Sequence, residues 1–279
     1  HWSLWTYGGS FICCAGAAWL ADKESSIKRW LEAASLHFLV LFLAAETRYQ
    51  LYDGNIFLKD YSLVEATINT LLWSSLGFVY QYRSRISEHL QTYYGICSKI
   101  LMVMAALNYM VMLTVLNPIW GQEAVGVTPI WNILLPAYGM PVLIALCCLK
   151  FFDSKLSRYS VIAAGFTLFA FVCLEIRHLW QKDLDISLPT SDGELYTYSI
   201  VWLLMATGAI LTAAGFRLQG LHKAGMGLLL LVVAKIFLVD MSDLEGLLRV
   251  ASFMGLGLSL LGIAFLYQKL SKNDSSIQG

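Results

Sequence analysis

The chain has 279 residues, of which 58% are hydrophobic and only 14% are charged, against about 45–50% and about 25% in typical soluble domains. Its 19 Lys and Arg are balanced by 19 Asp and Glu, so the chain has no excess of positive charge that would indicate a polyanionic partner such as nucleic acid. The same figures exclude disordered, collagen-like and coiled-coil chains. A soluble protein needs more polar residues to cover its surface, so the composition predicts a protein that crosses a membrane several times.

Nine segments are apolar and long enough, at roughly 20 residues each, to cross a bilayer as helices. In chain order they cover residues 2–21, 30–48, 64–82, 95–115, 131–149, 159–178, 197–216, 224–240 and 246–267. The expected fold is all-α: a polytopic integral membrane helical bundle with about nine transmembrane helices. The chain opens on His1 within an apolar segment, so we expect it to be the C-terminal part of a longer protein.

The basic residues are unevenly divided between the two sides of these spans. Alternate loops and the C-terminal tail hold twelve of the 19: Lys23, Lys28, Arg29, Arg83, Arg85, Lys150, Lys155, Arg158, Arg217, Lys223, Lys269 and Lys272. Because Lys and Arg are enriched in cytoplasmic loops, these loops and the C-terminus are predicted to be cytoplasmic, and the first residue to lie on the outer side.

A duplication runs through the chain. Trp2 and Glu46 are 44 residues apart, as are Trp131 and Glu175, and an arginine stands two residues after each glutamate. A repeat of this kind indicates that the fold contains two copies of one structural unit. Chance similarity between two apolar sequences is the alternative.

The repeat divides the predicted bundle into two tandem four-helix units and one extra helix. Since each unit has an even number of helices, both would have the same orientation and the repeat would be parallel. The predicted division is a first unit with its outer loop (1–130), a second unit (131–240), and the final helix with a cytoplasmic tail (241–279).

The repeated Glu-x-Arg motifs place charges at the outer ends of two spans. Residues at i and i+2 do not share a helix face, so the members of each pair are expected to bond to other helices or to their counterparts in the other unit. One interpretation is structural, with ion pairs that fix the packing among Glu46, Arg48, Glu175, Arg177 and Asp243.

A second charged cluster lies in the string AKIFLVDMSDLEGLLR and has no equivalent in the first unit. Charges within spans are costly and are candidates for function, and Arg with Lys suits a phosphate or carboxylate head group. The hypothesis is an anionic or lipid-linked ligand site formed by Lys235, Arg249, Arg177, Glu175 and Asp240. The alternative is a helical-hairpin lock, which pairs Lys235 with Asp240 or Asp243 and Arg249 with Glu175.

No catalytic or metal-binding motif is recognisable. The six cysteines lie in apolar stretches without C-x-x-C or Cys/His spacing, and GxxxxGK[ST], GxSxG and HExxH do not occur. We therefore predict no metal, no cofactor and no catalytic residue. His37, mid-span, is more typical of a hydrogen-bonded packing histidine than of a proton relay. Gly225 and Gly227 are expected to let the eighth and ninth helices pack closely.

The strings LEIRHLW, YSIVWLLMATGAILTAAGFR and LHKAGMGLLLLVVAKIFLVDMSDLEGLLRVASFMGLGLSLLGIAFLYQKL carry a resemblance. They look like the C-terminal region of a large bacterial multi-span predicted-membrane-protein family of unknown function, most clearly over residues 130–270. The resemblance implies a protein of the bacterial inner membrane, truncated at its N-terminus, and adds no activity.

Three functions are compatible with these features. The first is a transport or cell-envelope assembly component with an outer-facing anionic or lipid-linked ligand. The second is a non-catalytic membrane scaffold for partner proteins, and the third is an outer-face glycan or lipid transferase. The expected partners are membrane lipid and, in addition, membrane or periplasmic subunits, without nucleic acid.

Overall fold

The computed structural model describes residues 3–22, 25–55, 57–58, 60–121, 124–152, 154–216, 219–240 and 253–265. Every regular element in these ranges is a helix, which confirms the all-α prediction. By their contacts the helices form two units, residues 1–188 and residues 189–279.

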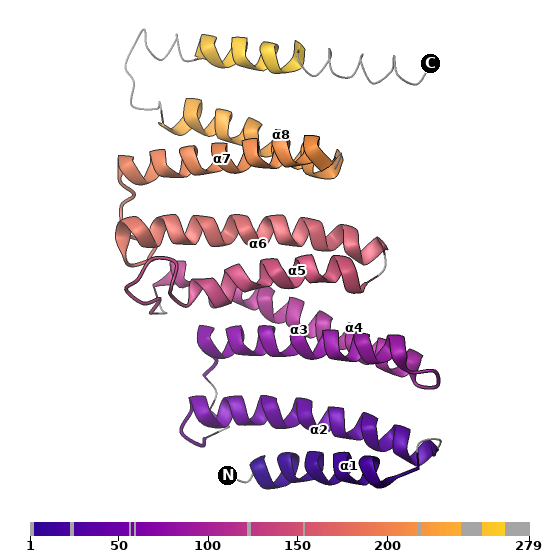
Figure 1. Cartoon of the computed structure of the whole chain (residues 1–279). Helices are drawn as coiled ribbons and strands as arrows, with labels where there is room; N and C mark the ends of the chain where they lie inside the picture. Colours follow the sequence, from indigo (N-terminus) through magenta and orange to yellow (C-terminus); the bar gives the residue numbers. More distant parts are fainter. Residues whose placement is uncertain are drawn as a thin grey trace, which may run out of the picture. The chain divides into compact units, whose positions relative to one another are not determined.

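The first unit is a series of helical hairpins (Figure 1). Its long elements pair in chain order, α1 with α2, α3 with α4, and α5 with α6, and three short helices accompany them. The elements are η1 (Leu4–Gly8), α1 (Gly9–Leu20), α2 (Ser26–Leu51), α3 (Leu63–Ile86), α4 (Gln91–Thr114), η2 (Pro118–Trp120), η3 (Leu135–Gly139), α5 (Met140–Phe151) and α6 (Ser154–Gln181).

The second unit contains a further hairpin of α7 (Asp192–Phe216) and α8 (Gln219–Lys235), which continues into the π-helical turn η4 (Ile236–Asp240). A separate helix covers Phe253–Phe265. Part of the ninth predicted span, together with Asp243 and Arg249, lies outside the described residues.

Within the described residues, five helical segments are long and apolar enough to cross a membrane: Ser26–Leu51, Gln91–Trp120, Tyr159–Gln181, Asp192–Gly215 and Gln219–Asp240. The predicted segments at 2–21, 64–82 and 131–149 contain helices that are shorter or more polar, and the segment at 246–267 is described only over residues 253–265. Membrane spans are therefore present in the described part of the chain, while the count of nine stays a prediction.

Helix α3 carries many buried polar residues and lies in the interior of the first unit. It contacts α2, α4, α5 and η3, and it buries Glu65, Thr67, Asn69 and Thr70 as well as apolar residues. The hydroxyls of Thr67 and Thr70 donate to the carbonyls four residues back, at 2.7 and 2.9 Å. These two hydroxyls are thus satisfied inside the protein, as a low-dielectric surrounding requires.

Two apolar cores hold the first unit together. One joins α3, α4, η3 and α6 through Leu63, Met112, Leu134, Tyr138 and Leu174. The other joins α2, α3 and α4 at their opposite ends, around Ala33, Leu76, Tyr80, Tyr94 and Leu101. The first core lies beneath the ends of α2 and α6 that carry the Glu-x-Arg motifs.

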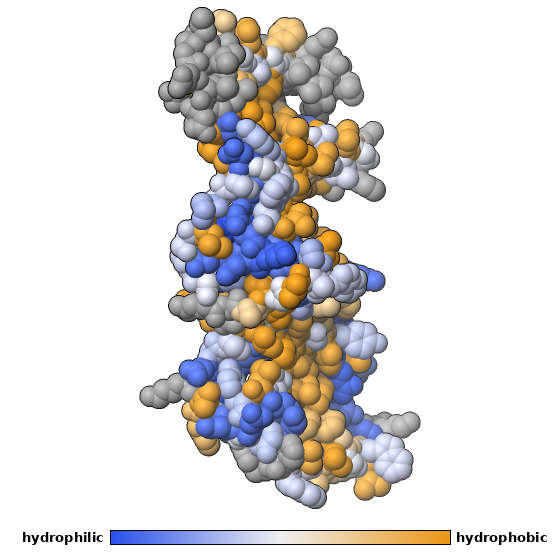
Figure 2. Space-filling view, turned by 90° about the vertical axis from the view of Figure 1, so that its left-hand side faces the viewer, coloured by the Kyte–Doolittle hydropathy of each residue, from blue (hydrophilic) through white to orange (hydrophobic). Residues whose placement is uncertain are grey.

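Apolar side chains also cover much of the helix surface between polar patches (Figure 2). Leu107 on α4, Leu143 on α5 and Leu204 on α7 are each more than 60% exposed. Broad apolar surface of this kind is rare on soluble monomers and is typical of helices that face lipid or protein.

Candidate functional site

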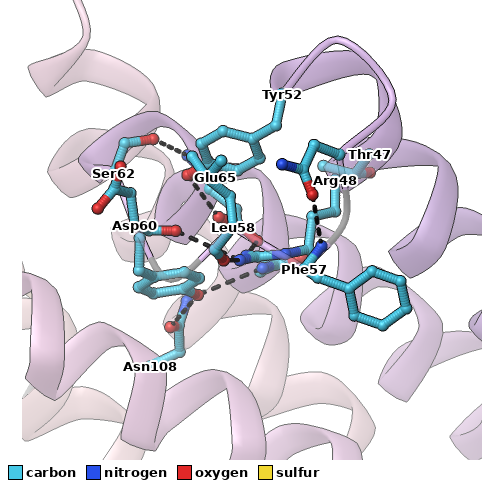
Figure 3. Close-up of polar contacts among 12 residues, drawn as sticks. Thr47, Arg48, Tyr52, Phe57, Leu58, Asp60, Ser62, Glu65 and Asn108 are labelled. Carbon is cyan, nitrogen blue, oxygen red and sulfur yellow. Dashed lines mark hydrogen bonds and ion pairs between the residues drawn. The ribbon is translucent and has the colours of Figure 1, made fainter.

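The first Glu-x-Arg motif, at the end of α2, is fastened to α3 by an ion pair between Arg48 and Glu65. Arg48 Nη1 lies 2.6 Å from Glu65 Oε1, and the Tyr52 hydroxyl donates to Glu65 Oε2 at 2.9 Å (Figure 3). The backbone amide of Glu65 donates to the Ser62 hydroxyl oxygen, which caps α3. A carboxylate in the first turn of a helix and a cation in the last turn both complement the helix dipole.

The guanidinium of Arg48 also binds the loop that joins α2 to α3. Its Nη2 donates to the carbonyl oxygens of Leu58 and Asp60 (Figure 3). The planar guanidinium has five donors in a fixed geometry, so one side chain binds the loop backbone and the Glu65 carboxylate together.

Next to this ion pair, Asn108 of α4 binds both the loop and α3. Its Oδ1 accepts from the Tyr61 hydroxyl at 2.7 Å, and its Nδ2 donates to the Ala66 carbonyl and to Thr70 Oγ1 at 2.7 and 2.8 Å. Asn69 Nδ2 donates to the same Tyr61 hydroxyl at 3.2 Å. Burial raises the pKa of Tyr61 above its ordinary value, so its hydroxyl keeps the proton that it donates.

The glutamate of the motif binds the segment that precedes it in the chain. The Ser3 hydroxyl donates to Glu46 Oε2 at 2.9 Å, and Gln50 Nε2 donates to Glu46 Oε1 at 2.7 Å. Since Ser3 stands at the start of η1, Glu46 connects the end of α2 to the beginning of its hairpin partner.

The second motif, on α6, makes the corresponding contacts. Glu175 accepts from the backbone amide of Ile130 and from Asn132 Nδ2, both at 3.0 Å. Its neighbour His178 is buried, and its Nε2 lies 2.8 Å from the Gly126 carbonyl oxygen. Together these two side chains fix the segment that leads into η3.

Arg177 binds the loop that follows α6. Its guanidinium donates to the carbonyl oxygens of Leu184, Asp185 and Leu188 at 3.3, 2.5 and 3.0 Å, and the residue is only 8% exposed. In both motifs, then, the glutamate binds the segment that begins its helical hairpin, and the arginine binds the loop after the hairpin. The proposed pairing between the two copies stays a prediction.

The charged cluster of the second unit forms a buried ion pair. Lys235 Nζ donates to Asp240 Oδ1 at 2.6 Å, to Ser199 Oγ at 2.7 Å and to the Leu195 carbonyl at 2.9 Å. Ser199 in turn donates to Asp240 Oδ2 at 2.5 Å. The side chains of Lys235 and Asp240 are 13% and 4% exposed.

The π-turn η4 explains how this ion pair forms. A π-turn closes hydrogen bonds from residue i to residue i+5, and Asp240 is five residues after Lys235. All three ammonium protons of Lys235 have acceptors on α7 and η4, so one pair of the predicted lock, Lys235 with Asp240, is present. Arg249 and Asp243, the other members expected here, lie outside the described residues.

His37 of α2 lies among the hydroxyls of tyrosines from α3 and α4. Its Nδ1 is 2.9 Å from Tyr80 Oη and 3.0 Å from the Ala33 carbonyl oxygen, and its Nε2 is 3.2 Å from Tyr93 Oη. This is the arrangement expected of a packing histidine. Among the described residues, no group of three or more His, Cys, Asp or Glu is placed to hold a metal ion.

Sequence reasoning missed several partners of the charged residues: Glu65, Asn108, Asn132 and Ser199. One signal was present for the first of them, since Ser62-x-x-Glu65 is a helix-capping pattern that recurs as Ser191-x-x-Glu194. The backbone amide of Glu194 indeed donates to the Ser191 hydroxyl oxygen.

Membrane-length apolar helices, arranged as consecutive hairpins with polar contacts at their ends, define an integral membrane protein of the helical class. The chain belongs to the family described as "Predicted membrane protein (DUF2339)", which matches residues 1–270. This confirms the resemblance and extends it over the first unit as well. No curated protein and no solved structure matches the chain.

Proposed function

We propose that this chain is a non-catalytic structural scaffold of the membrane, in which charged residues fix the order and spacing of the helices. The observation that carries the proposal is the buried Lys235–Asp240 pair, in which every ammonium proton is used within the α7–α8 hairpin. A cation that is to bind an exchangeable anion needs a free donor or an exposed face. Lys235 offers neither.

The proposal includes a tandem duplication of the framework. Six polar positions recur 129 residues apart: Ser3 and Asn132, Glu46 and Glu175, Arg48 and Arg177, Ser62 and Ser191, Glu65 and Glu194, and Thr70 and Ser199. Further support comes from η1 and η3, since each is a five-residue π-turn that runs into a twelve-residue α-helix. A repeated framework supports a structural role for the Glu-x-Arg motif, because a single ligand site would not need two copies.

The proposed location is the bacterial inner membrane, with the basic loops in the cytoplasm. The distribution of Lys and Arg supports this orientation, and the proposed partners are membrane lipid and further membrane or periplasmic subunits. The Glu-x-Arg contacts would then lie at the outer face.

Replacing the ion pair by apolar residues tests the proposal. Removing one partner of a buried pair costs about 3–5 kcal/mol, whereas replacing both by apolar residues of similar volume is often neutral. We therefore expect Lys235→Met to lower the thermal stability in lipid nanodiscs, and Lys235→Met with Asp240→Leu to restore most of it. Lys99→Met, at an exposed lysine of α4, is the matched control.

The second candidate function is a transport or envelope-assembly component with an anionic or lipid-linked ligand. One difference between the two repeats favours it. Ser199 binds the Lys235–Asp240 ion pair, whereas its counterpart Thr70 binds the neutral Asn108. This function predicts that nanodiscs of phosphatidylglycerol stabilise the wild type more than phosphatidylcholine does, and that the double variant loses the difference. The scaffold predicts the same lipid dependence for both proteins.

A further inference from the structure

The segment 126–132, between α4 and η3, exposes bulky apolar side chains at the end of the first unit. Val127 is 83% exposed, Trp131 80% and Ile130 56%. The segment is nevertheless ordered: the Thr128 hydroxyl donates to the Trp131 carbonyl at 2.5 Å, and the Trp131 amide donates to the Pro129 carbonyl at 2.8 Å. A folded loop therefore presents three apolar side chains outward.

Three polar groups of the segment bind side chains of α6. His178 binds the Gly126 carbonyl, and Glu175 binds the amide of Ile130 and the side chain of Asn132. Ile130 has a φ of 67°, a left-handed conformation that a β-branched residue rarely adopts. Such a conformation persists where its surroundings fix it, and the bond to Glu175 supplies that fixation here.

Its attachment to α6 also sets the depth of this segment. The apolar span Tyr159–Gln181 ends six residues after Glu175, which corresponds to about 9 Å along a helix. The loop is thus held beside the last two turns of a membrane-length helix, and the ends of such helices are where the hydrocarbon core of a bilayer meets the head groups. On the last turn of α6 itself, Leu179 and Trp180 are also exposed.

We propose that segment 126–132 is a membrane-interface anchor, whose Val127, Ile130 and Trp131 side chains enter the lipid boundary while Glu175 and His178 hold its backbone. The occupant is lipid, because residues 124–134 contain no charged side chain and can enter an apolar layer without burying an ion. Tryptophan, with its apolar ring and polar N–H, is the residue that such boundaries favour.

Fluorescence quenching in nanodiscs tests the anchor. The fluorescence of Trp131 is obtained by subtracting the fluorescence of the Trp131→Phe variant from that of the wild type, both as the full chain. Lipids brominated near the head group are expected to quench this difference strongly, and aqueous iodide only weakly. Strong quenching by iodide without quenching by brominated lipid would place Trp131 in water and overturn the proposal. Protection from both quenchers would show a protein surface over the loop, and would overturn it too.

A second variant tests whether Glu175 positions the loop. In Glu175→Gln, an amide nitrogen replaces one of the two oxygens that accept from Ile130 and Asn132, so a donor faces a donor. We expect the Trp131 signal to lose most of its quenching by brominated lipid and to gain quenching by iodide. The matched control is Asp192→Asn, at an exposed carboxylate that starts α7. Equal quenching in Glu175→Gln and the wild type would refute the positioning role.

Discussion

Arg177 shows what a single buried cation does in this protein, because its bonds go to backbone carbonyls of one short loop. Three carbonyl oxygens between Leu184 and Leu188 accept from the guanidinium. These carbonyls lie beyond the end of α6, and the Asp185 carbonyl also accepts from the Leu188 amide. The rigid fork of arginine, rather than charge alone, accounts for the choice of residue.

Arg177→Lys is therefore expected to destabilise the protein, although it preserves the charge. An ammonium group cannot reproduce the spread of the guanidinium donors, and hydrogen bonds to charged groups contribute about 1.5–3 kcal/mol each. We expect a loss of about that size in the free energy of unfolding, and faster hydrogen exchange at residues 184–188. Lys99→Arg is the reverse exchange at an exposed position and should change neither quantity. Unchanged exchange at 184–188 in Arg177→Lys would contradict this role.

The same loop contains a carboxylate whose protonation is linked to its fold. The backbone amide and the hydroxyl of Ser187 hold the pKa of Asp185 below its ordinary value of 3.8. A lowered pKa in the folded state means that ionised Asp185 stabilises the turn above pH 3.8 and that this contribution is lost as the pH falls through the lowered pKa. The turn should be insensitive to pH between 5 and 8.

Ser187→Ala should raise the pKa of Asp185 part of the way back, because it removes the hydroxyl and leaves the amide. A carbon-detected NMR titration of the aspartate carboxylates measures this shift. Ser10→Ala, at a hydroxyl that bonds within its own helical turn, should leave Asp185 unchanged. An unaltered titration of Asp185 in Ser187→Ala would show that the hydroxyl has no part in it.

At the scale of the element, two glycines of α8 differ in their surroundings: Gly225 is closely packed and Gly227 is not. A Cβ on Gly225 would lie 2.8 Å from Ile210 Cγ1 and 3.2 Å from the Ala206 carbonyl oxygen, both on α7. A Cβ on Gly227 would meet nothing within 4 Å. Gly225 therefore packs closely against α7, while the predicted packing of the eighth helix against the ninth stays a prediction.

Gly225→Ala should lower stability by about 1–3 kcal/mol, the range typical of overpacked sites. Gly227→Ala should raise it by about 0.5–1 kcal/mol, since alanine loses less backbone entropy than glycine in a helix. Thermal unfolding of the two variants in the same nanodiscs compares them directly. Similar shifts in both would mean that the α7–α8 contact is not close at Gly225.

Sequence reasoning was sound for the helices and weaker for their contacts. Hydropathy located α2, α4, α6 and α7 because a span needs a long apolar run. Hydropathy also placed a span at 64–82, within α3, but it did not show that the polar residues of this helix face protein. Composition does not say which neighbour covers a helix. The partners Asn132 and Ser199 were missed for the same reason: a neutral side chain gives no sign of its role until the fold brings a charge to it.

At the scale of the whole molecule, topology depends on whether α3 crosses the membrane. Its buried Glu65, Asn69 and Thr70 would be costly in contact with lipid, but each has a partner within the first unit. A polar helix surrounded by other helices is thus compatible with a crossing. If α3 crosses, the loops before and after it lie on opposite sides.

Epitope tags inserted into the full chain after Asn55, Glu88 and Asp183 test this topology. Antibody should reach the tags at Asn55 and Asp183 from outside spheroplasts, and the tag at Glu88 only after permeabilisation. This follows because α2, α3 and α4 run as consecutive antiparallel helices (Figure 1) and the basic residues after α3 favour the cytoplasm. If the tags at Asn55 and Glu88 are reached from the same side, α3 does not cross. The ion pair between Arg48 and Glu65 would then fasten α2 to a helix that lies along the surface of the membrane.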